Sequence, residues 1–482
     1  LEGDPDGTAL HFKNTHPIGS NQILPSVWVL YTGQCLYARS LIYFHLTKVS
    51  STDKVTSVSA KSWLILPPSI FRVFMIKLPA AFTRTMQDLL SKQYQAFEAS
   101  LEEEAPVSIR LHPGKVSTQH STNAAVPWCE LGRYLPKRPS FTLDPSFQAG
   151  AYYVQEASSM LVEAAFKACF PDQRPLRVLD LCAAPGGKTT LLASLLPAGS
   201  WLLANEVIRS RYQILRYNLH KWGYANTFTS NHDVEDFSEL KGYFDLVLVD
   251  APCSGEGLFR KDQAAREEWS IDNVQLCAAR QGRILKSAKE LVAPGGTLLY
   301  CTCTYNQQEN DFNARWLADQ SDLAYTPLGF PSEWGLEERP HGYQAYPHRV
   351  RGEGFFLSAF RKTDSTPGKF RAKPFQRIQE VKAKELATAK DWIDNADQFR
   401  CFTSDKGMWR LLPKSLVADA QVLSTQLKRL EVGAIFGEWK GKQFVPTPEW
   451  ALQLSCHPDL PAVEVDSDTA LEFLRKNTPS ID

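Results

Sequence analysis

Residues 246–257 read LVLVDAPCSGEG, and this stretch decides the fold class. Four consecutive apolar residues suit a strand that is buried on both faces of a parallel sheet. Asp250 stands where the strand should end, and Cys253 follows in a turn that contains Pro and Gly. Because ligands bind at the carboxyl ends of strands in open α/β sheets, we expect both residues at a binding site. A buried loop cysteine without a role is the alternative that this stretch leaves open.

The surrounding sequence alternates between strand and helix patterns. Helical patterns cover residues 209–222, which end at Gly223, and residues 275–291. Apolar strand candidates occupy residues 177–182, 201–205, 227–229, 246–250 and 297–304. This alternation predicts an α/β fold with a mostly parallel, doubly wound sheet.

Length and composition are typical of a soluble protein of two or three domains. The chain has 482 residues, of which 43% are hydrophobic and 22% are charged. Its 53 basic and 53 acidic side chains balance, so net charge does not indicate a nucleic-acid partner, although a basic cleft can exist within a neutral total. The 10 cysteines form neither a disulfide framework nor paired zinc-ligand motifs. We therefore expect a reducing cytoplasmic compartment and no metal.

The ends of the chain differ in character from its middle. Residues 23–46 are apolar, but Gly33, Gln34 and Arg39 interrupt them, so we do not expect a membrane span. From Met75 the pattern becomes regular, with a predicted helix pair, a strand at residues 108–111 and a helix from Tyr152 to Phe166. The predicted segments are an atypical extension with little order at 1–74, an N-terminal subdomain at 75–150, the α/β domain at 151–362, a linker at 363–379 and a separate small α+β domain at 380–482.

A glycine loop, CAAPGGKTT at residues 182–190, follows the first strand of the α/β domain. A P-loop needs Gly five positions before Gly187, where Cys182 stands instead, and the dinucleotide fingerprint is also absent. The small residues still allow backbone N–H groups to approach a ligand closely. Glu206 ends the second strand about 20 residues further on, as does the acid that binds ribose hydroxyls in nucleoside sites. Together the loop and the acid predict a nucleoside cofactor.

Two cysteines are expected to share one cleft. If the fourth and fifth strands are neighbours, they lie about 4.8 Å apart, and Cys253 and Cys303 meet at the carboxyl edge of the sheet. Two thiols without other soft ligands favour covalent chemistry over zinc binding. Two core thiols without a role remain the alternative.

Three motifs in order carry a resemblance to a family. DLCAAPGGKT at 180–189, DAPCSGEG at 250–257 and TCT at 302–304, followed by Glu309-Asn310, closely resemble the Nop/Sun family of RNA cytosine-C5 methyltransferases. The resemblance covers about residues 75–362. Residues 436–446 resemble the PUA-like RNA-binding domain of bacterial 16S rRNA members of that family. Arg110-Leu111-His112 departs from the Arg-x-Asn that is usual in the family, which puts a role for His112 in doubt.

The resemblance implies a Rossmann-like methyltransferase core between two RNA-binding domains, with S-adenosylmethionine as cofactor. It implies that Cys303 attacks cytosine C6, that Cys253 assists release of the product, and that Asp250 contacts the base. Glu206 would bind the ribose and Asp233 the adenine, with Asp250 also on the cofactor side. The implied loop contacts to the cofactor are Cys182, Ala183, Ala184, Pro185, Gly186, Gly187 and Lys188.

The function implied by the resemblance is cytosine-C5 methylation of RNA, with 16S rRNA or the small ribosomal subunit as the substrate of a monomer that does not bind membranes. Two alternatives remain open: the same chemistry on tRNA, and an RNA-binding ribosome assembly factor. DNA cytosine methyltransferases place their nucleophile in a Pro-Cys motif and lack the second cysteine, so Cys303 argues against them. Amino-group methyltransferases carry Asn- or Asp-Pro-Pro-aromatic, which the stretch after Val249 does not match.

Overall fold

The computed structural model describes residues 10–12, 76–115, 120–363, 368–404, 407–460, 462–475 and 477. Within residues 1–74 it describes only β1 (Leu10–Phe12), which pairs with β21 (Val463–Val465). The expectation of little order for the rest of that segment lies outside the described residues. Among the helices that are described, none is both long enough and apolar enough to span a bilayer.

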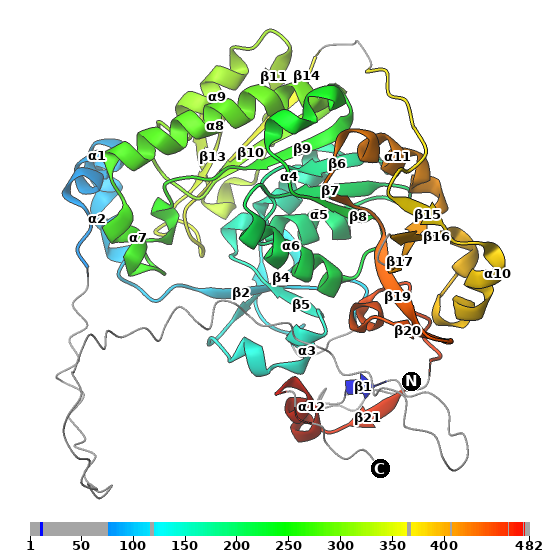
Figure 1. Cartoon of the computed structure of the whole chain (residues 1–482). Coiled ribbons are helices and arrows are strands. Elements are labelled where there is room, and N and C mark those ends of the chain that lie inside the picture. The colour runs from blue at the N-terminus through cyan, green and yellow to red at the C-terminus, as the bar shows by residue number, and fades with distance from the viewer. Residues whose placement is uncertain are drawn as a thin grey trace, which may run out of the picture.

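A ten-stranded sheet forms the centre of the molecule (Figure 1). Its strands lie in the order β12-β13-β14-β10-β9-β6-β7-β8-β18, with β11 also paired to β14. The five strands from β10 to β8 are parallel, and β14 and β18 join them antiparallel. The parallel strands are β6 (Arg177–Asp180), β7 (Trp201–Asn205), β8 (Thr227–Ser230), β9 (Phe244–Asp250) and β10 (Val292–Thr302). The antiparallel part comprises β11 (Leu323–Tyr325), β12 (Glu337–Arg339), β13 (Gly342–Ala345), β14 (Phe355–Lys362) and β18 (Leu430–Glu431).

The direction in which successive strands are added to the sheet reverses between β6 and β9. The order β8-β7-β6 runs one way from β6, and β9-β10 runs the other way. This reversal is a topological switch point, where the loops after two adjacent strands separate and leave room for a ligand. The predicted doubly wound sheet is confirmed, and so is the predicted adjacency of β9 and β10.

Helices cover both faces of this sheet because successive strand residues point to opposite sides. Leu246 and Leu248 of β9 pack in one buried cluster, whereas Val247 and Val249 pack in the other. The first face carries α4 (Leu161–Cys169), α5 (Gly187–Leu195) and α6 (Arg209–Trp222). The second face carries α8 (Ile271–Leu291), α9 (Asp311–Ala318) and α11 (Val417–Gln426). The short α7 (Gln263–Glu268) precedes α8.

The N-terminal part combines a helix pair with a four-stranded antiparallel sheet. The predicted pair is α1 (Ala80–Leu90) and α2 (Tyr94–Ser100), whose apolar faces pack on Phe259 and Trp269. The sheet order is β3-β4-β2-β5, with β2 (Val107–Leu111), β3 (Ala125–Val126), β4 (Cys129–Leu135) and β5 (Tyr152–Val154), and α3 (Pro145–Gln148) precedes β5. The predicted helix from Tyr152 is therefore wrong at its start. Residues 152–154 are aromatic or β-branched, and pairing with β2 makes them a strand.

The C-terminal part forms its own sheet but is not separate from the centre. Its strands lie in the order β15-β16-β17-β19-β20, whose bounds are Ile378–Glu380, Phe399–Ser404, Trp409–Pro413, Ala434–Lys440 and Gln443–Pro446. The short helix α10 (Ala383–Leu386) lies between β15 and β16 in the chain, whereas α12 (Ser467–Leu474) packs beside β21 and contacts α3 of the N-terminal part (Figure 1). However, β18 extends the central sheet beside β8, and α11 packs on that sheet through Leu416, Ala420 and Leu423. The expectation of a separate small domain is corrected, because these apolar side chains belong to the central core.

Gly223 marks how closely the C-terminal part approaches α6. It ends α6 with φ +90°, and a Cβ there would lie 2.2 Å from the carbonyl oxygen of Leu452. We predict that Gly223→Ala lowers the free energy of unfolding by at least about 3 kcal/mol, since backbone strain and a backbone clash add. Gly329→Ala, at φ +61° with no atom within 4 Å of the added Cβ, should lower it by only about 1 kcal/mol. Urea denaturation of both variants measures the difference, and equal losses would contradict close packing at Gly223.

Candidate active site

The predicted site residues meet at the switch point of the central sheet. Asp250 ends β9 and pairs in register with Cys301 of β10, so Cys303 lies just beyond the same edge. The loop after β9 stays bonded to β10, because the Ala251 amide donates to the Cys301 carbonyl at 2.9 Å. Leu181, after β6, donates in the same way to the carbonyl of Leu248 at 2.9 Å. Three strand ends therefore deliver their loops to one cleft edge.

Side chains of α6 hold the glycine loop after β6 by hydrogen bonds to its carbonyl groups. Gly186 adopts φ +111°, which favours glycine, and is the N-cap of α5. The Arg211 guanidinium donates to the Ala184 carbonyl at 2.8 Å, and the Asn218 amide donates to the Pro185 carbonyl at 2.8 Å. With its carbonyls bound on α6, the loop keeps the first amides of α5 available for a ligand.

Glu206 has the unsatisfied acceptor that a nucleoside site needs. It is 2% exposed, and its Oε1 accepts the Ile208 amide at 2.9 Å. Its Oε2 is buried and has no hydrogen-bond partner among the described residues, although Arg211 Nη1 lies 3.5 Å away as a charge partner. A buried carboxylate oxygen without a donor fits a ligand that brings hydroxyl groups, and the ribose of S-adenosylmethionine does so.

Asp233 lies on the same side of the cleft, three residues beyond β8. Its two oxygens accept from the guanidinium of Arg283 on α8 at 2.8 and 3.0 Å. The hydrogen bond from Arg283 lowers the pKa of Asp233, so this acid is charged at neutral pH. Asp233 is half-buried, which leaves it accessible as an acceptor for the predicted adenine contact.

Lys188 joins the glycine loop to the end of β9. Its ammonium donates to Asp250 Oδ2 at 2.7 Å, and Asp250 is 29% exposed while Lys188 is 14% exposed. Burial would lower the pKa of Lys188, but the Asp250 carboxylate more than offsets it, and the pKa is raised. Lys188 is therefore charged. The sequence predicted a separate role for each residue, and the structure makes them one ion pair.

The two predicted thiols lie in contact. The Sγ atoms of Cys253 and Cys303 are 3.1 Å apart, and the Cys303 amide lies 3.4 Å from Cys253 Sγ. The neighbouring Cys303 sulfur, together with burial, raises the pKa of Cys253 well above its ordinary value. Cys253 is thus a thiol at neutral pH. Within the described ranges, no three His, Cys, Asp or Glu side chains are grouped so that they could hold a metal ion.

Two buried glutamates hold the loops that carry these thiols, and the sequence reasoning did not identify them as functional. Glu256, in the loop after β9, accepts from the Thr304 hydroxyl at 2.6 Å and from the Tyr305 and Asn306 amides at 2.8 and 3.0 Å. Glu309, beyond β10, accepts the Ser254 amide at 3.0 Å. Each acid reaches from one loop to the other. Their presence inside the recognised motifs was the available signal.

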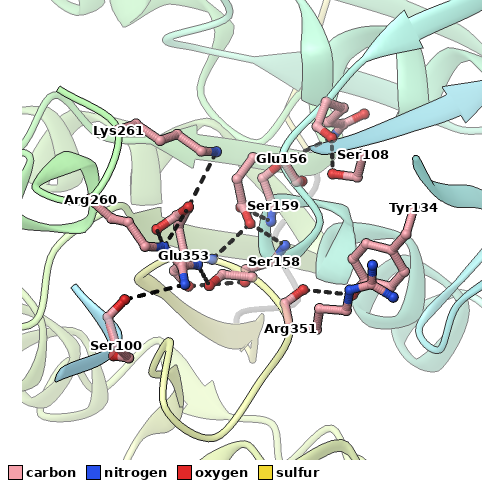
Figure 2. Close-up of polar contacts among 12 residues, drawn as sticks. Ser100, Ser108, Tyr134, Glu156, Ser158, Ser159, Arg260, Lys261, Arg351 and Glu353 are labelled. Carbon is pink, nitrogen blue, oxygen red and sulfur yellow. Dashed lines mark hydrogen bonds and ion pairs between the residues drawn. The ribbon is translucent and has the colours of Figure 1, made fainter. Parts of the chain in front are cut away.

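A second polar network lies beside the thiol-bearing loops and joins Glu156 to Glu353 (Figure 2). The Glu156 carboxylate accepts from the amides of Ser158, Ser159 and Glu353 at 2.8 to 2.9 Å. The Glu353 carboxylate, 3% exposed, accepts from Arg260 Nε at 3.0 and 3.1 Å.

This network holds the segment after Arg351, and that segment packs against the thiol-bearing loop. Tyr134 of the N-terminal sheet donates to the Arg351 carbonyl at 2.6 Å, and the Arg351 guanidinium lies over the Tyr134 ring at 4.2 Å (Figure 2). The Gly354 carbonyl lies 2.7 Å from the position of a Cβ at Gly257, so the two loops touch through backbone. The N-terminal sheet therefore supports the active site directly.

Asp180 is a further acid that the sequence reasoning quoted without assigning a role. It ends β6, is fully buried, and accepts the Thr189 hydroxyl on Oδ2 at 2.6 Å, while Oδ1 has no partner. Burial raises the pKa of Asp180 to about 7. His112, whose role was in doubt, accepts from the Gly114 amide at 2.9 Å and bonds the Trp222 carbonyl at 3.0 Å, so its contacts are structural.

Comparison with known sequences gives matches to two families. Residues 170–361 match the family described as 16S rRNA methyltransferase RsmB/F, and residues 78–157 match the N-terminal domain of 16S rRNA methyltransferase RsmF. The ribosomal RNA small subunit methyltransferase F of Escherichia coli (strain UMN026) is 32% identical over 435 residues, which cover 83% of this chain and 88% of that protein. The protein of the same name from Salmonella schwarzengrund is 32% identical over 432 residues, with the same shares covered.

Solved structures share the fold. A methyltransferase homologue from Pyrococcus horikoshii has a TM-score of 0.52 at 28% identity, covering 62% of this chain and 100% of that chain. NSun6 from Pyrococcus horikoshii has a TM-score of 0.51 at 18% identity, covering 60% of this chain and 100% of that chain. These likenesses confirm the predicted methyltransferase core.

The raised pKa of Asp180 makes stability depend on pH. The folded chain holds this proton up to about pH 7, whereas an unfolded Asp releases it near about pH 3.9. Between these values the unfolded state binds fewer protons, so the free energy of unfolding falls as the pH rises. Asp180→Asn removes this pH dependence. The free energy of unfolding of the variant minus that of the parent should therefore rise with pH, by up to about 1.4 kcal/mol per pH unit in that window. Urea denaturation across the window tests this, with the exposed Asp319→Asn as control; a difference that does not vary with pH would contradict it.

Proposed function

The chain belongs to the RsmB/F family of 16S rRNA methyltransferases, and on that premise we propose that it methylates C5 of a cytosine in 16S rRNA. The family identifies it as an rRNA methyltransferase whose cofactor is S-adenosylmethionine. The observation that carries the choice of C5 is the contact between the Cys253 and Cys303 sulfurs at 3.1 Å beside the glycine loop. Methyl transfer to an amino group or a hydroxyl needs no thiol, whereas C5 has to be activated covalently.

The residues at the switch point fit the cofactor. The loop from Cys182 to Lys188 would surround its methionine and ribose parts, Glu206 would accept from the ribose hydroxyls, and Asp233 would accept from the adenine. Asp250, through Lys188, would lie between cofactor and base. The unpartnered Glu206 Oε2 supports this assignment. When bound, S-adenosylmethionine supplies a methyl group on a positively charged sulfur.

Cys303 is proposed as the nucleophile. The Cys303 thiol proton passes to N3 of the base through water, Sγ forms a bond to cytosine C6, and the electron pair of the C5–C6 double bond moves toward C5 and the N3 side of the ring; N3 returns its proton to water once the product has formed. The Asp250 carboxylate would accept a hydrogen bond from the proton that N3 has taken up, so the charge at N3 is neutralised while C5 becomes nucleophilic enough to accept a methyl group. Lys188 keeps Asp250 in place through the 2.7 Å ion pair.

Cys253 is proposed to release the product. With the Cys303 sulfur 3.1 Å away, the pKa of Cys253 is raised, so Cys253 would keep its proton and could donate it. As the Cys303–C6 bond breaks, the Cys253 proton passes to the departing Cys303 sulfur. The Cys253 thiolate then takes the proton from C5, and the electron pair of that C–H bond restores the C5–C6 double bond. Sulfur atoms 3.1 Å apart suit this exchange.

The remaining parts of the chain are proposed to bind RNA. The target cytosine has to leave its stack to reach such a cleft, so a flipped or single-stranded base is the substrate. We assign RNA binding to residues 75–150 and to the PUA-like residues 380–482. The exposed Trp439, beside Lys440, supports the latter assignment, since aromatic and basic side chains together bind single-stranded RNA. We propose a monomer that acts in the cytoplasm without a membrane.

Replacing each thiol separately tests the division of roles. Cys303→Ala should lower methylation of 16S rRNA transcripts or small subunits by at least about a thousandfold, because the adduct cannot form. Cys253→Ala should form the adduct and fail to release it, giving an RNA–protein species of low mobility on a denaturing gel. Cys169→Ala, on α4 and remote from the cleft, is the control. Normal turnover by Cys253→Ala would contradict the division of roles.

Bisulfite sequencing of total RNA tests the substrate. A strain without the gene should lose one unconverted cytosine in 16S rRNA, and the gene should restore it. Loss at a tRNA position instead would support the tRNA alternative. If the chain is an assembly factor, Cys303→Ala should restore full growth to the strain without the gene. If our proposal is correct, the cytosine should stay unmodified in the strain that carries Cys303→Ala.

A further inference from the structure

Arg110, on β2 of the N-terminal sheet, reaches into the cofactor loop. Its Nη2 donates to the Thr190 hydroxyl at 2.6 Å and lies 3.4 Å from the Gly187 carbonyl. Its Nε donates to the Gln155 side chain at 2.9 Å, and the guanidinium lies 4.6 Å from the centre of the Trp222 ring. Gly187 is the first residue of α5. An arginine from the N-terminal part therefore touches the turn on which the cofactor loop ends.

The hydrogen bonds continue from Arg110 to the glycine of the loop. Thr190 Oγ1 accepts from Arg110 and donates its own proton to the Gly186 carbonyl at 2.8 Å. A cation that polarises the hydroxyl strengthens this second bond, because successive hydrogen bonds reinforce each other. Gly186 is the residue with φ +111° that turns the loop into α5. The Gly186 carbonyl, which also accepts the Thr190 amide at 2.9 Å, is therefore linked to Arg110 through the Thr190 hydroxyl.

This arrangement is unfavourable for stability alone. Arg110 is 2% exposed, no described carboxylate forms an ion pair with it, and its Nη1 lacks a hydrogen-bond partner. Burial lowers the pKa of Arg110 to about 10, which leaves it charged at neutral pH. It also lies at the N-terminal end of α5, where the helix dipole disfavours a cation. An apolar side chain of similar volume would be less costly to bury there.

We propose that Arg110 is a positioning residue for the cofactor, which holds Gly186 and Gly187 through Thr190 in the conformation that binds S-adenosylmethionine. The methyltransferase core thus needs the N-terminal sheet to complete its cofactor site. Tyr153, on β5 of that sheet, adds a second contact by donating to the Pro185 carbonyl at 3.2 Å. The inference rests on the proposed function only in taking S-adenosylmethionine as the ligand of this loop.

Calorimetric titration with S-adenosylhomocysteine, the demethylated cofactor, tests this proposal without any turnover. Arg110→Met removes the charge and the donors, and Thr190→Val removes the hydroxyl between Arg110 and Gly186. Each should raise the Kd for S-adenosylhomocysteine about tenfold with an unchanged binding stoichiometry. Arg110→Lys keeps the charge but loses the planar fork, so its Kd should be intermediate. Thr190→Ser keeps the hydroxyl and should bind like the parent protein.

Steady-state kinetics and a matched control separate positioning from loss of structure. The KM for S-adenosylmethionine should rise more than kcat falls in Arg110→Met. Arg133→Met makes the same replacement on β4 of the same sheet, where the arginine bonds only to the backbone, and should leave the Kd unchanged.

The outcomes are distinct. A lower stoichiometry with an unchanged Kd in Arg110→Met, or a Kd within about twofold of the parent in both Arg110→Met and Thr190→Val, would overturn the proposal. If Arg110→Met does not fold, the two Thr190 variants decide alone. If the parent protein itself binds no S-adenosylhomocysteine, the proposed function fails, and not the assignment of Arg110.

Discussion

The parallel pairing of β9 between β6 and β10 is the constraint on which the active site depends. β9 pairs with β6 through residues 246–248 and with β10 through residues 246–250, with Leu248 opposite Asp180 on one side and Leu299 on the other. The register fixes where each strand ends, so the loops that begin at Asp180, Asp250 and Cys301 leave the sheet at the same edge. A slip of one residue would turn every side chain of β9 to the opposite face and remove the site. Apolar packing on both faces of the sheet makes such a slip costly.

Beyond the strand ends, buried carboxylates rather than apolar contacts position the reactive groups. Glu256 and Glu309 bridge the two thiol-bearing loops, and Asp250 holds Lys188 across the cleft. Hydrogen bonds to charged acceptors are directional, so they fix atoms more closely than hydrophobic contact does. The cost of burying Glu256 and Glu309 is met by several donors for each of these two acids. The cofactor side differs, because Glu206 and Asp180 each keep one buried oxygen without a partner.

The N-terminal and C-terminal parts of the chain both contact the central part around the proposed site. The N-terminal sheet contacts the cofactor loop through Arg110 and the segment behind the catalytic loop through Tyr134. The C-terminal part contributes β18 and α11 to the central sheet and its core, and the Arg429 amide donates to His232, next to Asp233, at 2.9 Å. The two parts that are proposed to bind RNA therefore both contact the segments that form the proposed cofactor site.

The sequence by itself determined the central fold and the main site residues, because both depend on local patterns. Apolar runs such as residues 246–249 form strands wherever they are buried, and a loop of small residues followed by Glu206 indicates a nucleoside site in any doubly wound sheet. Motif resemblance added the family and a division of roles between Cys303 and Cys253. Only the tertiary structure decided that Tyr152 begins a strand, that β18 leaves its own sheet for the central one, and that Arg110 lies under the cofactor loop. Each of these depends on a partner more than 40 residues away, as Arg110 does on Thr190, 80 positions along the chain, and no local pattern encodes such a distance.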